Sequence, residues 1–60
     1  MFTLKDLVKL TVFPYYFARI VELRGALGPN GCQVYKIQIL NCSSMFVEVC
    51  DYQIEKTQNS

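Results

Sequence analysis

Residues 34–40 read Val-Tyr-Lys-Ile-Gln-Ile-Leu, and this stretch decides the class of fold. Tyr35, Ile37 and Ile39 alternate with Lys36 and Gln38, which is the period-two pattern of a strand that buries one face. An amphipathic helix would need apolar residues at steps of three and four over roughly ten or more positions, and this stretch does not supply them. The segment is therefore predicted to be a β-strand.

Similar signals recur along the chain. Alternation, or a β-branched pair among charged residues, predicts strands in three further segments: residues 8–12, 18–24 and 45–50. A last short strand is expected around residues 54–57.

The residues between these segments are typical of turns. Residues 25–31 hold all three glycines and one of the two prolines, which favours a hairpin loop, and residues 41–44 form a second polar turn. Residues 51–54 are predicted to form a tight helical turn capped by Asp51. The sequence thus predicts an all-β fold of five strands with one short helical turn before the last strand.

Five short strands in 60 residues favour a small closed or half-open barrel, because closure removes exposed strand edges. The order of features resembles the SH3-like barrel: a first strand, an aromatic-rich connection, two hairpins, a helical turn and a closing strand. The segments that are similar to small bacterial SH3-like domains of the KOW type are residues 6–10, 14–15, 19–23, 48–49, 51 and 54.

The resemblance implies one SH3-like domain over residues 1–57, followed by a frayed polar tail, residues 58–60. An OB-type barrel is the alternative. Phe17-Ala18 stands where the KOW-type families usually place a glycine, so binding of RNA or the ribosome is not carried over from them.

Composition argues against several classes of function. Six Lys or Arg residues and five Asp or Glu residues give a net charge of +1, which is too balanced for a nucleic-acid backbone or an anionic membrane surface. Hydrophobic residues make up 52% of the chain and charged residues 18%, which argues against disorder. No stretch is predicted to span a membrane or to act as a secretory signal, so a cytoplasmic protein is expected.

Catalytic and metal-binding patterns are not found in the sequence. The chain has no histidine, so Ser–His and Cys–His nucleophile pairs are excluded within it. Cys32, Cys42 and Cys50 lack the Cys-x-x-Cys spacing of zinc sites, and free, partly buried thiols are expected. A three-cysteine metal site and an intermolecular disulfide are the alternatives. We predict no enzyme activity and no cofactor.

An aromatic cluster, Phe-Pro-Tyr-Tyr-Phe at residues 13–17, is the unusual feature of the chain. Tyrosine suits an exposed binding surface, because its ring contributes contact area while its hydroxyl stays in water. The alternative is that Phe13 and Phe17 plug one end of the barrel beneath the tyrosines. The predicted partner-binding residues are Phe13, Tyr15, Tyr16, Phe17, Arg19 and Tyr52.

Two functions follow from this cluster. The first is a non-enzymatic interaction module or small accessory subunit, which docks on a protein partner or associates with itself as a homodimer. The second is a single-stranded nucleic-acid binder, which would stack bases on the aromatic rings. Its cations would be Lys9, Arg19, Arg24 and Lys36.

Overall fold

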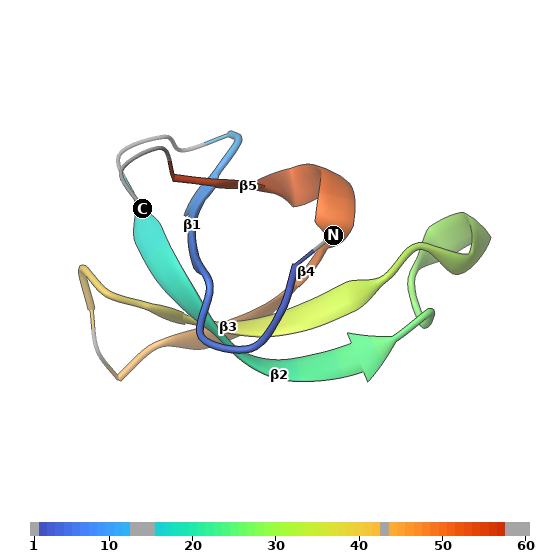
Figure 1. Ribbon diagram of the computed structural model, residues 1–60, viewed down its shortest axis with the longest axis horizontal. Helices are drawn as coiled ribbons and strands as arrows, with labels where there is room; N and C mark the ends of the chain where they lie inside the picture. The colour runs from blue at the N-terminus through green and yellow to red at the C-terminus, as the bar shows by residue number, and fades with distance from the viewer. Residues whose placement is uncertain (1, 13–15, 43, 58–60) are drawn as a thin grey trace.

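A computed structural model describes residues 2–12, 16–42 and 44–57, and it contains one antiparallel sheet in the order β4-β3-β2-β1-β5 (Figure 1). The strands are β1 (Leu7–Leu10), β2 (Phe17–Gly25), β3 (Val34–Ile39), β4 (Phe46–Cys50) and β5 (Ile54–Lys56). Two 3-10 turns, η1 (Pro29–Gly31) and η2 (Asp51–Gln53), precede β3 and β5. The predicted all-β fold with a helical turn before the last strand is confirmed.

The sheet is not closed, so a barrel is not confirmed. Among the described residues, β4 pairs only with β3 and β5 pairs only with β1, which makes these two strands the edges of the sheet. No described segment is a helix with the length and apolar character needed to cross a lipid bilayer.

One core collects side chains from across the sheet. Its buried members are Val8, Ala18, Ile20, Tyr35, Ile37, Ile39 and Ile54. Val47 and Val49 of β4 pack against the same cluster, as does Leu10 of β1. Strands from both edges therefore face one interior, and Figure 1 shows β1 and β5 lying across from β2 and β3. The sheet is curled, and its concave side is the core.

The long strand β2 is irregular in a way that helps this curl. Its register against β3 shifts between Ile20 and Glu22 and again between Leu23 and Gly25. Such bulges bend a strand and increase its twist. The first part of β2 pairs with β1, while the whole strand runs beside β3. The bend therefore turns the far end of the β2–β3 hairpin away from β1.

The two turns are fixed by short-range hydrogen bonds. The Gly31 N–H donates to the Gly28 carbonyl at 3.0 Å, and Asn30 and Gly31 take the left-handed φ values of 58° and 76°. At η2 the Cys50 N–H donates to Gln53 Oε1 at 2.7 Å. The N-cap of this turn is Cys50, so the predicted capping role of Asp51 is not found; Asp51 is instead the first residue of η2.

Candidate functional site

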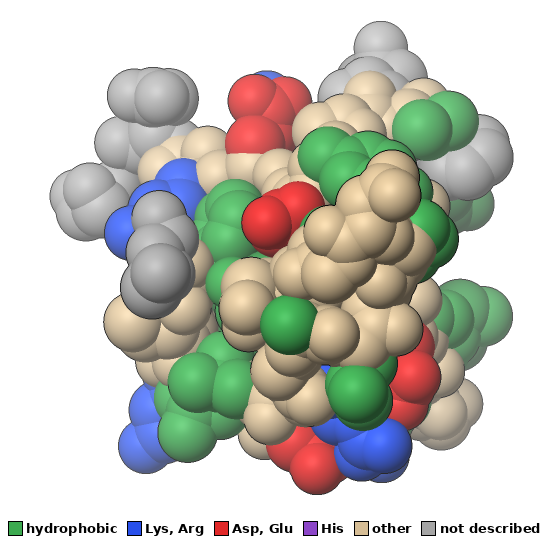
Figure 2. All heavy atoms as spheres, turned by 90° about the vertical axis from the view of Figure 1, so that its right-hand side faces the viewer, with side chains coloured by type: hydrophobic (Ala, Val, Ile, Leu, Met, Phe, Trp, Pro, Cys, Tyr) green, Lys and Arg blue, Asp and Glu red, His purple; other side chains and the backbone are tan. Residues whose placement is uncertain are grey.

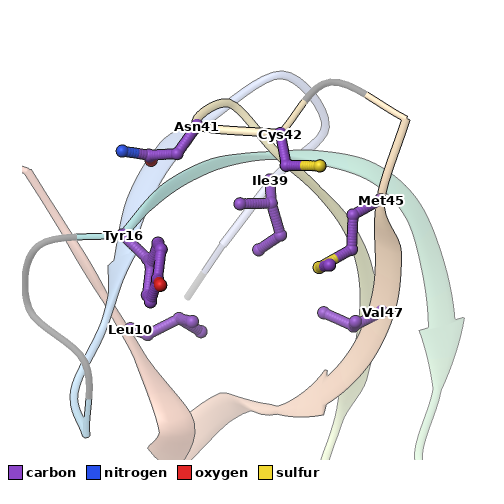
Figure 3. Close-up of a pocket in the computed structure, with 7 residues that line it drawn as sticks. All are labelled: Leu10, Tyr16, Ile39, Asn41, Cys42, Met45 and Val47. Carbon is purple, nitrogen blue, oxygen red and sulfur yellow. The ribbon is translucent and has the colours of Figure 1, made fainter.

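An apolar pocket opens where β1 ends and where β3 turns into β4. It encloses about 440 Å³. Its lining consists of Leu10, Tyr16, Ile39, Asn41, Cys42, Met45 and Val47. Leu10 and Tyr16 face Met45 and Val47 across the space, and Ile39 points into it from above (Figure 3). No charged side chain is among these lining residues, so the pocket favours an uncharged, apolar ligand.

Backbone hydrogen bonds hold both walls in place. On one side, the Leu10 N–H donates to the Tyr16 carbonyl at 3.2 Å, which brings the end of the aromatic connection back to β1. On the other, the Ile39 N–H donates to the Met45 carbonyl at 2.9 Å, and the Met45 N–H donates to the Cys42 carbonyl at 2.9 Å. The pocket is therefore built on the sheet and on a closed turn.

The pocket stays open because β1 and β4 face each other without pairing. A second hollow of about 210 Å³ continues along the same gap and is lined by Leu10, Val12, Val49 and Gln53. Leu10 belongs to both hollows, while Val47 and Val49 are successive inward positions on β4. An apolar groove thus follows the gap between β4 and β1.

Of the predicted partner-binding residues that the structure describes, only Tyr16 lies at this pocket. Tyr16 lines it and keeps 46% of its surface exposed. Tyr52 lies elsewhere, on η2, beside a separate hollow that is also lined by Phe2 and Tyr35. Tyr52 is 65% exposed. Phe13 and Tyr15 lie outside the described residues.

Phe17 and Arg19 lie on the other face of the sheet. They alternate along β2 with Ala18 and Ile20, which are fully buried, so their side chains point to the convex side. Phe17 is 43% exposed, so it does not plug the interior. The four predicted residues that the structure describes, Tyr16, Phe17, Arg19 and Tyr52, therefore do not form one surface.

Sequence reasoning missed most of the pocket lining. Leu10, Ile39, Met45 and Val47 lie in segments that the sequence predicts only as strands. Nothing in the local sequence shows that the end of β1 faces the start of β4, because this contact depends on the curl of the sheet. Cys42 was noted for its thiol rather than for its place in the turn beside the pocket.

The cations proposed for nucleic-acid binding are partly engaged with acidic and aromatic groups. Arg24 contacts Glu22 Oε2 at 3.0 Å and Glu48 Oε2 at 3.5 Å. Lys36 stands opposite both acids in the strand registers, and its ammonium lies 5.6 Å from the centre of the Phe46 ring. Acidic and basic side chains also adjoin at the hairpin end of the molecule (Figure 2). The surface shown there carries no single-sign patch.

Comparison of the chain with protein-family models, with curated proteins and with solved structures found no match.

Proposed function

We propose that this chain is a non-enzymatic interaction module that binds an extended, uncharged apolar segment of a partner protein in the pocket beside Tyr16. The observation that carries the proposal is the pocket, with about 440 Å³ of space and an uncharged lining. This volume lies in the range of roughly 300–1,000 Å³ that is usual for ligand sites. Tyr16 and Met45 suit this role, since tyrosine gives a large amphipathic contact and methionine adapts its shape.

The edge position of β4 supports a peptide as the occupant. Val47 lies in β4 and Met45 immediately precedes it, so one wall of the pocket belongs to a strand with an open side. Extended peptides add to such edges through backbone hydrogen bonds, and their alternate side chains then enter neighbouring pockets. A peptide on this edge would direct every second side chain toward the groove.

We also infer that the curled sheet follows the SH3-like arrangement expected from the sequence. The support is the strand order, with β1 between β2 and β5, and the position of η2 between β4 and β5. The gap beside β4 is then a binding groove of a half-open barrel. In this proposal the protein works in the cytoplasm, without a cofactor and without a catalytic residue.

Single-stranded nucleic acid has less support as the partner. Arg24 is paired with two carboxylates, and Lys36 stands between the same two acids. Binding of single strands depends on a continuous cationic groove beside exposed rings. The groove beside Tyr16 has no cation in its lining.

The test begins with selection from a library of unstructured peptides displayed on phage, followed by NMR titration of the chain with a selected peptide. Shifts are expected at Leu10, Ile39 and Val47. Met45→Asp places a charge at the rim and should weaken binding at least tenfold, since each tenfold corresponds to about 1.4 kcal/mol and burial of an unpaired charge costs more. Leu27→Asp is the matched control, because Leu27 is 72% exposed on the β2–β3 connection.

Three outcomes would contradict the proposal. They are shifts confined to the convex face around Phe17 and Arg19, equal weakening by both aspartate variants, and tight salt-sensitive binding of a labelled oligonucleotide in place of peptide. Light scattering tests a fourth outcome, in which the chain forms a homodimer. A homodimer that Met45→Asp dissociates would make a second copy of the chain the occupant of the groove.

A further inference from the structure

Two sulfur atoms from different segments meet over Gly28. Cys50 ends β4, and Cys32 lies between η1 and β3. A Cβ atom placed on Gly28 would stand 2.9 Å from Cys50 Sγ and closer still to Cys32 Sγ. Because both sulfurs lie within 2.9 Å of one point, their separation cannot exceed twice that distance. Both thiols are free, and both side chains are half-buried.

The backbone holds the two cysteines together. The Asp51 N–H, next to Cys50, donates to the Gln33 carbonyl, next to Cys32, at 3.0 Å. The Gly28 N–H donates to the Cys32 carbonyl at 3.0 Å, which holds the β2–β3 connection next to the two sulfurs. The approach of the thiols is therefore fixed by the end of the sheet rather than by the side chains alone.

Hydrogen bonds with the Cys50 side chain affect the pKa values of two neighbouring groups, Cys32 and Tyr52. A hydrogen bond with the Cys50 side chain raises the pKa of the Cys32 thiol to about 11, and partial burial and the Asp51 charge act in the same direction. A hydrogen bond with the same side chain raises the pKa of Tyr52. Because their pKa values are raised, Cys32 and Tyr52 keep their protons at neutral pH.

We propose that Cys32 and Cys50 form a reversible redox site, which closes to an intramolecular disulfide when the chain meets an oxidised low-molecular-weight disulfide. The site lies at the η2 end of the molecule and does not share a residue with the pocket beside Tyr16. The inference is therefore independent of the proposed binding function.

The chemistry is a pair of thiol–disulfide exchanges. The Cys50 thiolate attacks one sulfur of oxidised glutathione, which forms a mixed disulfide and releases one glutathione thiolate. Cys32 then passes its proton to the released glutathione thiolate and attacks Cys50 Sγ, which closes the Cys32–Cys50 bond and releases the second glutathione as a thiolate. Two cysteine thiols are oxidised, and one glutathione disulfide is reduced to two glutathione molecules.

A metal ion is a poorer fit for the same sulfurs. In the part of the chain that the structure describes, no three groups among His, Cys, Asp and Glu come together in a way that could hold an ion. Structural sites for thiophilic ions such as zinc usually need four ligands. A disulfide needs only the two sulfurs.

The test uses a Cys42→Ser background, so that the exposed third thiol cannot take part. The folded chain is equilibrated with reduced and oxidised glutathione at pH 8, alkylated and analysed by mass spectrometry. Loss of two thiols without a glutathione adduct is expected, with a Cys32–Cys50 cross-linked peptide. The same chain with Cys32→Ser or Cys50→Ser should retain glutathione as a mixed disulfide.

Comparing disulfide formation in the folded and the denatured chain shows whether the fold brings the two sulfurs together. The equilibrium constant for forming this disulfide should be on the order of a hundredfold larger in buffer than in denaturant. The melting temperature should rise on the order of 10 °C on oxidation and fall back with dithiothreitol. Two results would overturn the proposal. One is a folded chain that carries glutathione adducts but no Cys32–Cys50 disulfide, and the other is an equilibrium constant no larger in buffer than in denaturant.

Discussion

Gly28→Ala tests the packing between the β2–β3 connection and the end of β4. The Gly28 backbone has φ −84° and ψ 178°, an extended conformation that any residue adopts. Alanine is therefore not strained at this position, and it would by itself stabilise the fold by about 0.4–1 kcal/mol by restricting the unfolded chain. A net loss of stability can arise only from the added methyl group.

The methyl group has no room. It would overlap Cys32 Sγ, lie 2.9 Å from Cys50 Sγ and lie 3.1 Å from the Cys32 carbonyl oxygen. Overpacking of this kind costs about 1–3 kcal/mol. A thiol can rotate away, which favours the lower half of this range, but the rotation separates the two sulfurs. After the gain from the unfolded chain, we expect a net loss of about 0.8 kcal/mol in the free energy of unfolding.

Urea denaturation followed by circular dichroism measures this loss, with the slope against denaturant unchanged. A double-mutant cycle with Cys32→Ala identifies its cause. Removing the nearest sulfur should recover part of the loss caused by Gly28→Ala. Gly31→Ala is the matched control, because Gly31 has a φ of 76° and no atom within 4 Å of an added Cβ. The loss of stability in Gly31→Ala comes from backbone strain, so it should add to the change in stability caused by Cys32→Ala.

A neutral or stabilising Gly28→Ala would refute the reasoning. So would strict additivity between Gly28→Ala and Cys32→Ala, since it would mean that the methyl group and the sulfur do not compete for space.

Two further predictions concern the core and the N-terminus. Ile37 is fully buried on β3, so Ile37→Val should lower the free energy of unfolding by about 0.5–1.5 kcal/mol. Val12 is 70% exposed, so Val12→Ala should change the free energy of unfolding by less than about 0.5 kcal/mol. Equal effects of the two substitutions in urea denaturation would contradict the assigned core. The pKa of Asp6 is lowered because the Thr3 N–H and hydroxyl donate to its carboxylate at 2.9 and 3.1 Å, so its stabilising effect is present above its ordinary pKa of 3.8 and is lost as the pH falls through the lowered value. Asp6→Asn should therefore destabilise the fold near neutral pH and approach the parent chain in acid, and parallel curves of stability against pH would rule this out.

The strands were predictable from sequence because their signal is local. Alternation in residues 34–40 correctly placed Ile37 and Ile39 on the buried face. The same alternation explains why Phe17 and Arg19 do not join Tyr16: once β2 begins at Phe17, successive side chains face opposite sides of the sheet. Adjacency in the sequence therefore does not place Tyr16 and Phe17 on one surface.

The pocket could not be predicted in the same way. It joins Leu10 of β1 to Val47 of β4 and to Met45, which immediately precedes β4, and these two strands are far apart along the chain and do not pair. Their approach depends on the bend in β2, and a bulge is a property of pairing register that a single strand's sequence does not display. The meeting of Cys32 and Cys50 follows instead from the register of β3 against β4, in which Val34 pairs with Cys50.

The position of β1 between β2 and β5 has a consequence for biosynthesis. Leu10 pairs with Ile54, so β1, which is synthesised before the other four described strands, waits for β5 before its second side is covered. Ile54 also supplies a buried side chain to the core. A nascent chain halted before β5 would hold an uncovered edge and an incomplete interior, so this sheet is complete only once β5 has been synthesised.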